Sequence, residues 1–192
     1  LQAGLVAGDT LLVNGGSGGV GTAAIQIAHA MGARVIAGVR NEAVHDRIRA
    51  LGATVLLPDA AIAHAREVGG ADVVLELVGA VHVNASIAAL ARRGRLVIVA
   101  AKPGDTVQLE LRELMARRAQ LIATTLRTRP LEEKGVLVQA FARRVVPLLA
   151  DGTLAPLVDR TFALDVAADA LDAIREPGKL GKLLLAVGPD AA

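Results

Sequence analysis

The sequence predicts a doubly wound α/β fold, in which a parallel sheet carries helices on both faces. Short β-branched segments alternate with longer segments of helical periodicity along the 192 residues. Hydrophobic residues make up 53% of the chain, and this proportion suits a sheet that is buried on both faces. A glycine-rich loop joins the first strand to the first helix. The aromatic residues are Phe141 and Phe162, so we expect a core of Leu, Val, Ile and Ala.

The alternation defines the elements in order. The predicted strands are Thr10–Asn14, Arg34–Val39, Thr54–Leu57, Asp72–Leu77, Arg95–Ala100 and Gln120–Thr125. The predicted helices are Gly19–Met31, Glu42–Leu51, Ala60–Glu67, Val81–Ala91, Leu109–Arg117 and Leu131–Ala150. Right-handed crossovers favour the strand order 3-2-1-4-5-6, which is that of the Rossmann fold. Gly32 and Gly52 are typical of helix ends that precede a strand.

The last of these predicted helices is the longest. Its apolar residues fall at helical spacing and predict a buried stripe; they are Leu137, Phe141, Val145 and Leu148. Pro147 lies inside this pattern, so we expect the helix to kink or end early there.

The chain divides into three predicted parts. Residues 1–9 have the pattern of a helix tail and a turn, and residues 10–152 form the sheet domain. Residues 153–192 follow the six strands and contain a further strand, helix and strand, at Val158–Leu164, Val166–Arg175 and Lys182–Val187. We expect this C-terminal segment to belong to a domain whose remainder lies elsewhere.

The glycine-rich loop runs from Asn14 to Gly21 and predicts a dinucleotide site. Gly16, Gly18 and Gly21 match the G-x-G-x-x-G pattern. In that pattern the first glycine allows a tight turn, the second lets the backbone approach a pyrophosphate, and the third lets helix and strand pack closely. The backbone of Ser17, Gly18, Gly19 and Val20 is therefore the predicted phosphate contact, at a helix N-terminus. The alternative is a glycine turn that binds no ligand.

The end of the second strand predicts which cofactor is preferred. A site for NAD places Asp or Glu there to hold the ribose hydroxyls, but this chain has Arg40 and Asn41, with no acid before Glu42. A guanidinium can pair with a 2′-phosphate, whereas a carboxylate repels it. We therefore expect NADP(H), with Arg40 and Asn41 as contacts. The alternative is that Arg40 is an exposed arginine at a helix start.

Composition excludes several classes of function. The chain has no cysteine, which removes disulfides, thiolate zinc sites and a cysteine nucleophile. The 21 basic and 19 acidic residues give a net charge of +2, and the arginine pairs lack the interleaved aromatics of a nucleic-acid surface. No apolar run reaches the roughly 18 residues of a membrane span, and no signal peptide is visible. We expect no nucleic-acid or membrane partner, and a cytoplasmic location.

Other candidate residues predict structural roles. Thr22, not Lys, follows Gly21, so the loop is not that of a P-loop NTPase. The four histidines are predicted to lie in helices, at the surface or in a groove, without metal-ligand spacing; they are His29, His45, His64 and His82. Glu76 interrupts an apolar strand, and we expect it to accept hydrogen bonds from neighbouring loops because a buried charge without partners is costly. We find no catalytic residue and no metal site in this chain.

Several segments together resemble the medium-chain dehydrogenase/reductase superfamily, specifically its zinc-independent quinone oxidoreductase branch. The resemblance covers nearly the whole chain. The segments that carry it are residues 8–13, 18–21, 24–28, 51–53, 72–75, 94–97 and 181–185. Residues 125–129 and the long helix after them are most similar to the subgroup of the p53-induced quinone oxidoreductase. The alternative within this resemblance is the enoyl-reductase module of a multidomain synthase.

The resemblance also implies roles that the residues alone do not. It implies that hydride passes directly from NADPH to a quinone or another activated alkene or carbonyl. It places the nicotinamide end of the cofactor against Val78-Gly79, Ala100-Ala101 and Leu126-Arg127, and it matches Lys182 to the family's closing lysine, for which we expect solvent exposure. It implies a missing N-terminal catalytic domain that supplies most of the substrate pocket, so we expect the isolated chain to be inactive.

A non-enzymatic function remains an alternative, as a nucleotide-binding or dimerisation module. The sixth predicted strand, Gln120–Thr125, carries no charge or proline that would block pairing. We expect it to pair antiparallel with its copy across a two-fold axis, which gives a homodimer.

Overall fold

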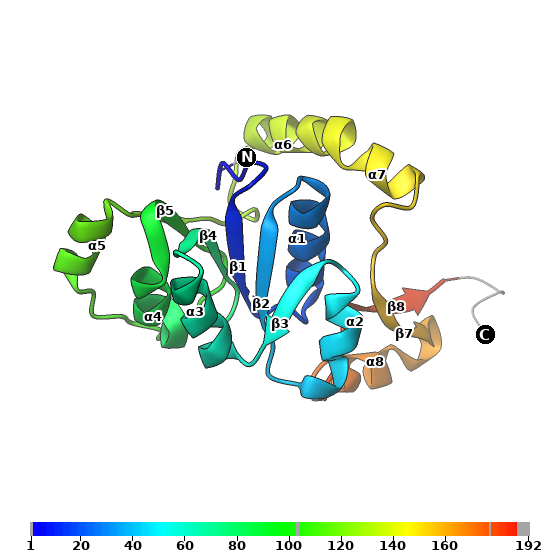
Figure 1. Cartoon of the computed structure of the whole chain (residues 1–192). Coiled ribbons are helices and arrows are strands. Elements are labelled where there is room, and N and C mark those ends of the chain that lie inside the picture. Colours follow the sequence, from blue (N-terminus) through cyan, green and yellow to red (C-terminus); the bar gives the residue numbers. More distant parts are fainter. Residues whose placement is uncertain (1, 103, 177, 188–192) are drawn as a thin grey trace.

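The computed structural model describes residues 2–102, 104–176 and 178–187. Its centre is a six-stranded parallel sheet in the order β3-β2-β1-β4-β5-β6 (Figure 1), which confirms the predicted order. The strands are β1 (Thr10–Asn14), β2 (Arg34–Gly38), β3 (Ala53–Leu56), β4 (Ala71–Glu76), β5 (Leu90–Ile98) and β6 (Gln120–Ala123). Every residue of β1 is buried, with Leu12 opposite Ile36 on one side and Val74 on the other.

Helices cover the sheet on both faces. One face packs against α1 (Gly19–Ala30), η1 (Glu42–Val44) and α2 (His45–Arg49), and the other against α3 (Pro58–Glu67), α4 (Val83–Ala88) and α5 (Leu111–Arg117). The short helix η2 (Ala80–His82) precedes α4 and has no buried residue. The first face has a core that includes Val13, Ile25 and Ile48, and the second a core that includes Leu12 and Ile87. The buried hydrophobic residues of the described chain are all Leu, Val, Ile or Ala, as the composition predicts.

The glycines that were predicted to end helices do so. Gly32 follows the C-terminal cap of α1 and Gly52 follows α2, with φ angles of +79° and +95°. Such left-handed conformations favour glycine after a helix, since a Cβ would be strained there. Both helices therefore stop where the next strand must begin.

The long C-terminal helix of the sheet domain is broken and is not buried. It forms α6 (Leu131–Arg144) and α7 (Val146–Ala150), with the break beside Pro147 as predicted. The predicted stripe is wrong for this structure, because neither helix has a buried residue and Phe141 is 48% exposed. Phe141 and Val145 instead line an apolar cavity of about 260 Å³, whose opposite wall includes Ala23 and Ile27 of α1.

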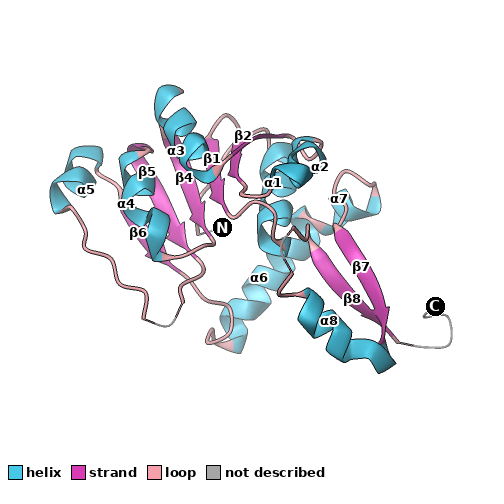
Figure 2. Ribbon diagram, turned by 90° about the horizontal axis from the view of Figure 1, so that it is seen from below, coloured by secondary structure: helices cyan, strands magenta, loops and turns pink. Residues whose placement is uncertain are grey.

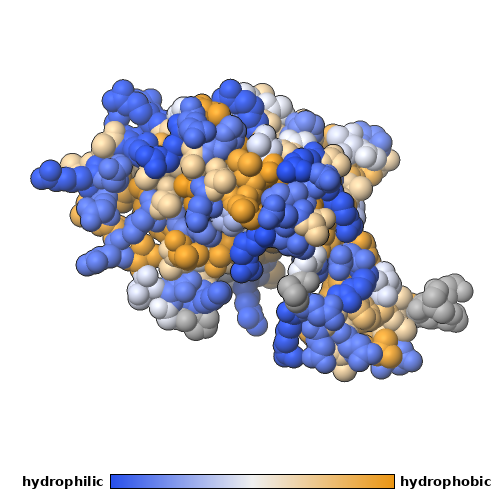
Figure 3. All heavy atoms as spheres, turned by 60° about the horizontal axis from the view of Figure 1, so that its bottom comes forward, coloured by the Kyte–Doolittle hydropathy of each residue, from blue (hydrophilic) through white to orange (hydrophobic). Residues whose placement is uncertain are grey.

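A second unit follows α7. It contains β7 (Val158–Ala163), η3 (Leu164–Val166), α8 (Ala167–Ala173) and β8 (Lys182–Ala186), with β7 and β8 parallel. Figures 2 and 3 show this unit as a lobe beside the sheet domain. Contacts that attach the lobe to the sheet domain include Leu180, which is fully buried in the core on the α1 side of the sheet. The Gln26 side chain also exchanges two hydrogen bonds with the Ala155 backbone, of 2.9 and 3.0 Å.

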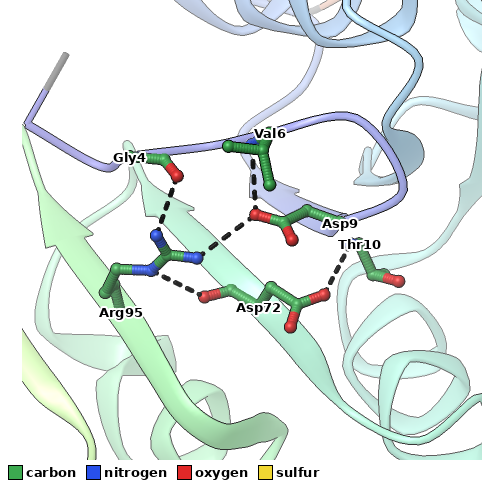
Figure 4. A network of polar contacts seen from close by, with 6 residues as sticks. All are labelled: Gly4, Val6, Asp9, Thr10, Asp72 and Arg95. Carbon is green, nitrogen blue, oxygen red and sulfur yellow. Dashed lines mark hydrogen bonds and ion pairs between the residues drawn. The ribbon is translucent and has the colours of Figure 1, made fainter.

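The segment before β1 is fixed at the amino end of the sheet. Arg95 of β5 donates to the Gly4 carbonyl at 2.9 Å, to the Asp9 carboxylate at 3.2 Å and to the Asp72 carbonyl at 3.3 Å (Figure 4). Asp72 in turn accepts from the Thr10 N–H at 2.8 Å. This network lies at the opposite end of the strands from the glycine-rich loop.

Two local expectations are corrected. The helix predicted over Val81–Ala91 ends at Ala88, because Leu90 already pairs with Ala71 of β4 as the first residue of β5. The register of this pair then shifts before Arg95, where Arg93 has a φ of +63° and Gly94 is tightly packed. His45 is not at the surface. It is buried, with Nε2 2.9 Å from the Val39 carbonyl oxygen. In the described residues, no helix combines the length and apolarity needed to span a bilayer.

Candidate functional site

The glycine-rich loop connects β1 to α1 at the carboxyl end of the sheet. Its three pattern glycines have different surroundings. A Cβ on Gly21 would overlap the Gly15 carbonyl oxygen and lie 2.8 Å from the Gly16 Cα, and a Cβ on Gly16 would lie 3.0 Å from the Ala37 Cβ. A Cβ on Gly18 would meet only the Gly15 carbonyl oxygen, at 3.9 Å. Packing thus requires glycine at position 21 and leaves little room for a side chain at position 16, whereas Gly18 faces open space.

The loop leaves backbone donors free. The N–H groups of Gly15 and Gly16 donate to the Gly38 carbonyl, and that of Thr22 donates to Gly18. Within the described chain, the N–H groups of Ser17, Val20 and Gly21 have no acceptor. The first turn of α1 contains no acidic residue. Unpaired N–H groups at a helix N-terminus favour an anion, because the helix dipole is positive there.

The C-terminal lobe reaches this loop. Gly181 forms a parallel bridge with Gly18, and its N–H donates to the Ser17 carbonyl at 3.0 Å. The aliphatic part of Lys182 lies against Gly19, where a Cβ would overlap it. The expectation of a solvent-exposed Lys182 is confirmed. Its side chain also lies along the loop and brings a positive charge to it.

The end of β2 carries Arg40 and Asn41. Arg40 is exposed, and Asn41 caps η1 by accepting the Ala43 N–H at 3.2 Å. The Asn41 amide also donates to the Gly178 carbonyl of the C-terminal lobe at 3.5 Å. No acidic residue lies between the end of β2 and Glu42, which is exposed. The end of β2, which is hydrogen-bonded to the glycine-rich loop, therefore carries the cation of Arg40 and no carboxylate.

In the turn after β4, unlike in the glycine-rich loop, the backbone N–H groups have acceptors within the protein. The fully buried Glu76 carboxylate accepts from Val78 N–H at 2.8 Å, from Gly79 N–H at 3.1 Å and from the Asn14 amide at 2.7 Å. Asn14 also donates to the buried Ser86 hydroxyl at 2.8 Å. The sequence prediction that Glu76 accepts hydrogen bonds from neighbouring loops is confirmed.

The loop after β5 lies against this turn. Asp105 accepts from Lys102 N–H at 3.0 Å and from Ala80 N–H at 3.2 Å, both through Oδ2. These N–H groups, first that of Lys102 and then that of Ala80, hold the pKa of the Asp105 carboxyl below its ordinary value. The carboxylate also lies directly over Gly79, whose φ is +117°.

Several of the predicted site residues are thus brought together. A Cβ on Gly15 would lie 3.3 Å from the Val78 side chain, so the glycine-rich loop touches the turn after β4. A Cβ on Gly79 would lie 3.9 Å from the Ala101 Cα, so this turn also touches the loop after β5. Ala100 is half-buried. Leu126 and Arg127, which follow β6, are exposed and have no described contact with the other candidates. In the described residues, no three His, Asp or Glu side chains lie close enough to hold a metal ion.

Comparison with known proteins gives the family. Residues 19–143 match the family model described as zinc-binding dehydrogenase. The chain belongs to this family. It is a cofactor-domain segment of a medium-chain dehydrogenase/reductase, as the sequence predicted.

The relatives are oxidoreductases and a synthase. The chain is 27% identical to human quinone oxidoreductase, a match that covers 93% of this chain and 55% of the relative. It is 33% identical to a polyketide synthase of Streptomyces halstedii, with 97% of this chain and 3% of the synthase covered. The quinone oxidoreductase of Thermus thermophilus, solved alone and with NADPH, superposes with a TM-score of 0.84 at 32% identity, covering 97% of this chain and 60% of that one. The chain spans about half the length of the quinone oxidoreductases that it matches.

Sequence reasoning missed three contributors. Asp105 was not singled out, although a Gly-Asp pair shortly after a predicted strand is a turn signal that could have indicated it. The contacts of Gly178 with Asn41 and of Gly181 with Ser17 join residues more than 130 positions apart. No local pattern in the sequence contains that information.

Proposed function

We propose that this chain is the NADP(H)-binding domain of an oxidoreductase that transfers hydride to a quinone or another activated alkene or carbonyl. One observation carries the proposal: free backbone donors at the start of α1 stand beside a strand end that has Arg40 and no acid. The first feature suits a pyrophosphate and the second a 2′-phosphate. The solved NADPH complex of a structural relative supports the same cofactor.

The chain's own residues would bind and orient the cofactor. The backbone of Ser17, Gly18, Gly19 and Val20 would hold the pyrophosphate, and Arg40 with Asn41 the 2′-phosphate. Val78-Gly79, Ala100-Ala101 and Leu126-Arg127 would border the nicotinamide end. Bound NADPH supplies the hydride, while the protein positions it and keeps water away. We assign no catalytic or metal-binding residue to this chain, and we propose that the reaction is zinc-independent.

The rest of the active site would come from outside this chain. The domain bounds 1–9, 10–152 and 153–192 stay predictions, as does the return of the last segment to an N-terminal catalytic domain. We propose that the substrate is a small molecule bound mainly by that domain, and that the isolated chain is inactive. The homodimer through β6 is also a proposal; β6 does lie at the sheet edge. A cytoplasmic location stays a prediction.

A second candidate is the enoyl-reductase module of a multidomain synthase, and the match to a polyketide synthase favours it. Both candidates use the same cofactor site. Coding sequence before Leu1 separates them, since a synthase continues into other catalytic domains. A non-catalytic nucleotide-binding module is separated from both by the absence of any hydride transfer in the full-length protein.

Calorimetric titration tests the cofactor assignment. We expect the chain to bind NADPH about tenfold more tightly than NADH, which corresponds to one charge-assisted contact with the 2′-phosphate. Arg40→Ala should abolish this preference, whereas Arg47→Ala, an exposed arginine of α2, should preserve it. Tighter binding of NADH would contradict the choice of cofactor. If neither nucleotide binds, the proposed function is wrong.

A further inference from the structure

The turn after β4 has no backbone donor left for a ligand. Four successive N–H groups, from Leu77 to Ala80, each have an acceptor within the protein: the Asn14 carbonyl for the first, Glu76 for the next two and Asp105 for the last. A ligand that meets this turn therefore finds carbonyl oxygens and small side chains. Glu76 accepts its two hydrogen bonds from inside the core, whereas Asp105 accepts its hydrogen bond from a different, exposed loop.

Asp105 joins two loops through one oxygen atom. Its Oδ2 accepts from Lys102 N–H, in its own loop, and from Ala80 N–H, in the turn after β4. Glycine at position 79 suits this bridge, because a side chain there would overlap the carboxylate. Hydrogen bonds from N–H groups to an ionised carboxylate are stronger than neutral ones, so a single exposed residue can fix the separation of the two loops.

We propose that Asp105 is a positioning residue, which holds the loop after β5 against the turn after β4 and so shapes the nicotinamide end of the site. The inference rests on the proposed function, since Val78-Gly79 and Ala100-Ala101 are the residues assigned there. Asp105 itself touches neither the cofactor nor the substrate. It acts by fixing the backbone of residues that do.

The two halves of the cofactor should respond differently to loss of this bridge. The adenosine and 2′-phosphate half would lie near Arg40 and the glycine-rich loop, and neither of these contacts Asp105 in the described structure. Loss of the bridge should therefore weaken only ligands that extend to the nicotinamide. A residue that merely supports the fold would weaken all ligands equally.

The test compares two ligands on one set of variants. NADPH and 2′-phospho-ADP-ribose, which lacks the nicotinamide, are titrated calorimetrically into the parent chain, Asp105→Ala and Asp105→Asn. We expect Asp105→Ala to weaken NADPH binding about tenfold, since two charge-assisted hydrogen bonds are lost, and to change 2′-phospho-ADP-ribose binding less than about twofold. Asp105→Asn keeps an amide oxygen that can accept both N–H groups, so it should restore most of the affinity.

Asp151→Ala is the matched control. Asp151 is likewise exposed and accepts a backbone N–H, that of Thr153 at 2.9 Å, with a lowered pKa caused by that same residue. It lies after α7, outside the candidate site, and its loss should change neither affinity. The proposal is overturned if Asp105→Ala binds NADPH like the parent, or weakens both ligands to the same extent. A parent chain that binds neither ligand refutes the proposed function itself, which is a different result.

Discussion

The loop after β1 and the turn after β4 are neighbours with opposite hydrogen-bond character. The first leaves the N–H groups of Ser17, Val20 and Gly21 without acceptors in the described chain and has Lys182 beside it. The second has every N–H from Leu77 to Ala80 accepted, two of them by Glu76 and one by Asp105. A pyrophosphate suits the first and is disfavoured at the second, where the carboxylates repel it. For the proposed NADP(H), the pair favours one direction of binding, with the pyrophosphate at the loop after β1 and the uncharged part of the cofactor at the turn after β4.

The largest effect should come from the packing glycine of the first loop. In Gly21→Ala the new methyl group would overlap the Gly15 carbonyl and press on the Gly16 backbone, which cannot rotate away. We expect the free energy of unfolding to fall by about 3 kcal/mol or more, measured by urea denaturation. Gly18→Ala is the matched change in open space and should cost less than about 1 kcal/mol, which is the loss from replacing the glycine N-cap of α1 by alanine. Equal losses in the two variants would show that the loop is not packed as described.

A somewhat smaller loss should come from the turn after β4. Glu76→Ala leaves the N–H groups of Val78 and Gly79 and the Asn14 amide without their acceptor in a buried site. We expect a loss of about 2–3 kcal/mol in unfolding free energy. Glu67→Ala, which removes an exposed carboxylate 3.7 Å from His64, should change stability by less than about 0.5 kcal/mol. If Glu76→Ala is as stable as the parent, the Glu76 carboxylate does not stabilise the turn after β4, and the contrast between the two loops is wrong.

The smallest expected change in free energy is a loss of NADPH affinity that leaves the fold intact. Gly18→Ala keeps the fold but places a methyl group where the cofactor's pyrophosphate would approach the backbone. We expect NADPH to bind about tenfold more weakly, or roughly 1.4 kcal/mol, by calorimetry. Gly135→Ala adds the same methyl group in α6, where no atom outside the neighbouring residues of the helix lies within 4 Å of it, and should leave the affinity unchanged. Unchanged NADPH binding in Gly18→Ala would place the pyrophosphate elsewhere.

The sequence predicted those parts that local patterns determine. Strand order, the glycine helix ends and the breaking of the last helix beside Pro147 follow from periodicity, crossover handedness and backbone preference. The exposure of Phe141 did not follow, because it depends on how closely α6 approaches α1. The surface position predicted for His45 was wrong for a similar reason, since its ring reaches back to the Val39 carbonyl under α2.

The candidate site was predicted unevenly. The glycine-rich loop and the strand end at Arg40 are contiguous in sequence, so their residues could be named directly. The bridge made by Asp105 joins positions 25 apart, and the contact of Gly181 with Ser17 joins more distant ones. These contacts depend on strand order and loop path together, which only the folded chain specifies.

The most direct test is a ¹⁵N–¹H NMR titration of the chain with inorganic pyrophosphate. It examines whether the free N–H groups of the loop after β1 bind a diphosphate. We predict saturable shifts in the amide signals of Ser17, Val20 and Gly21, with the signals of residues 77–80 unmoved. Equal shifts at both places, or unmoved loop signals at concentrations that displace NADPH, would contradict this assignment.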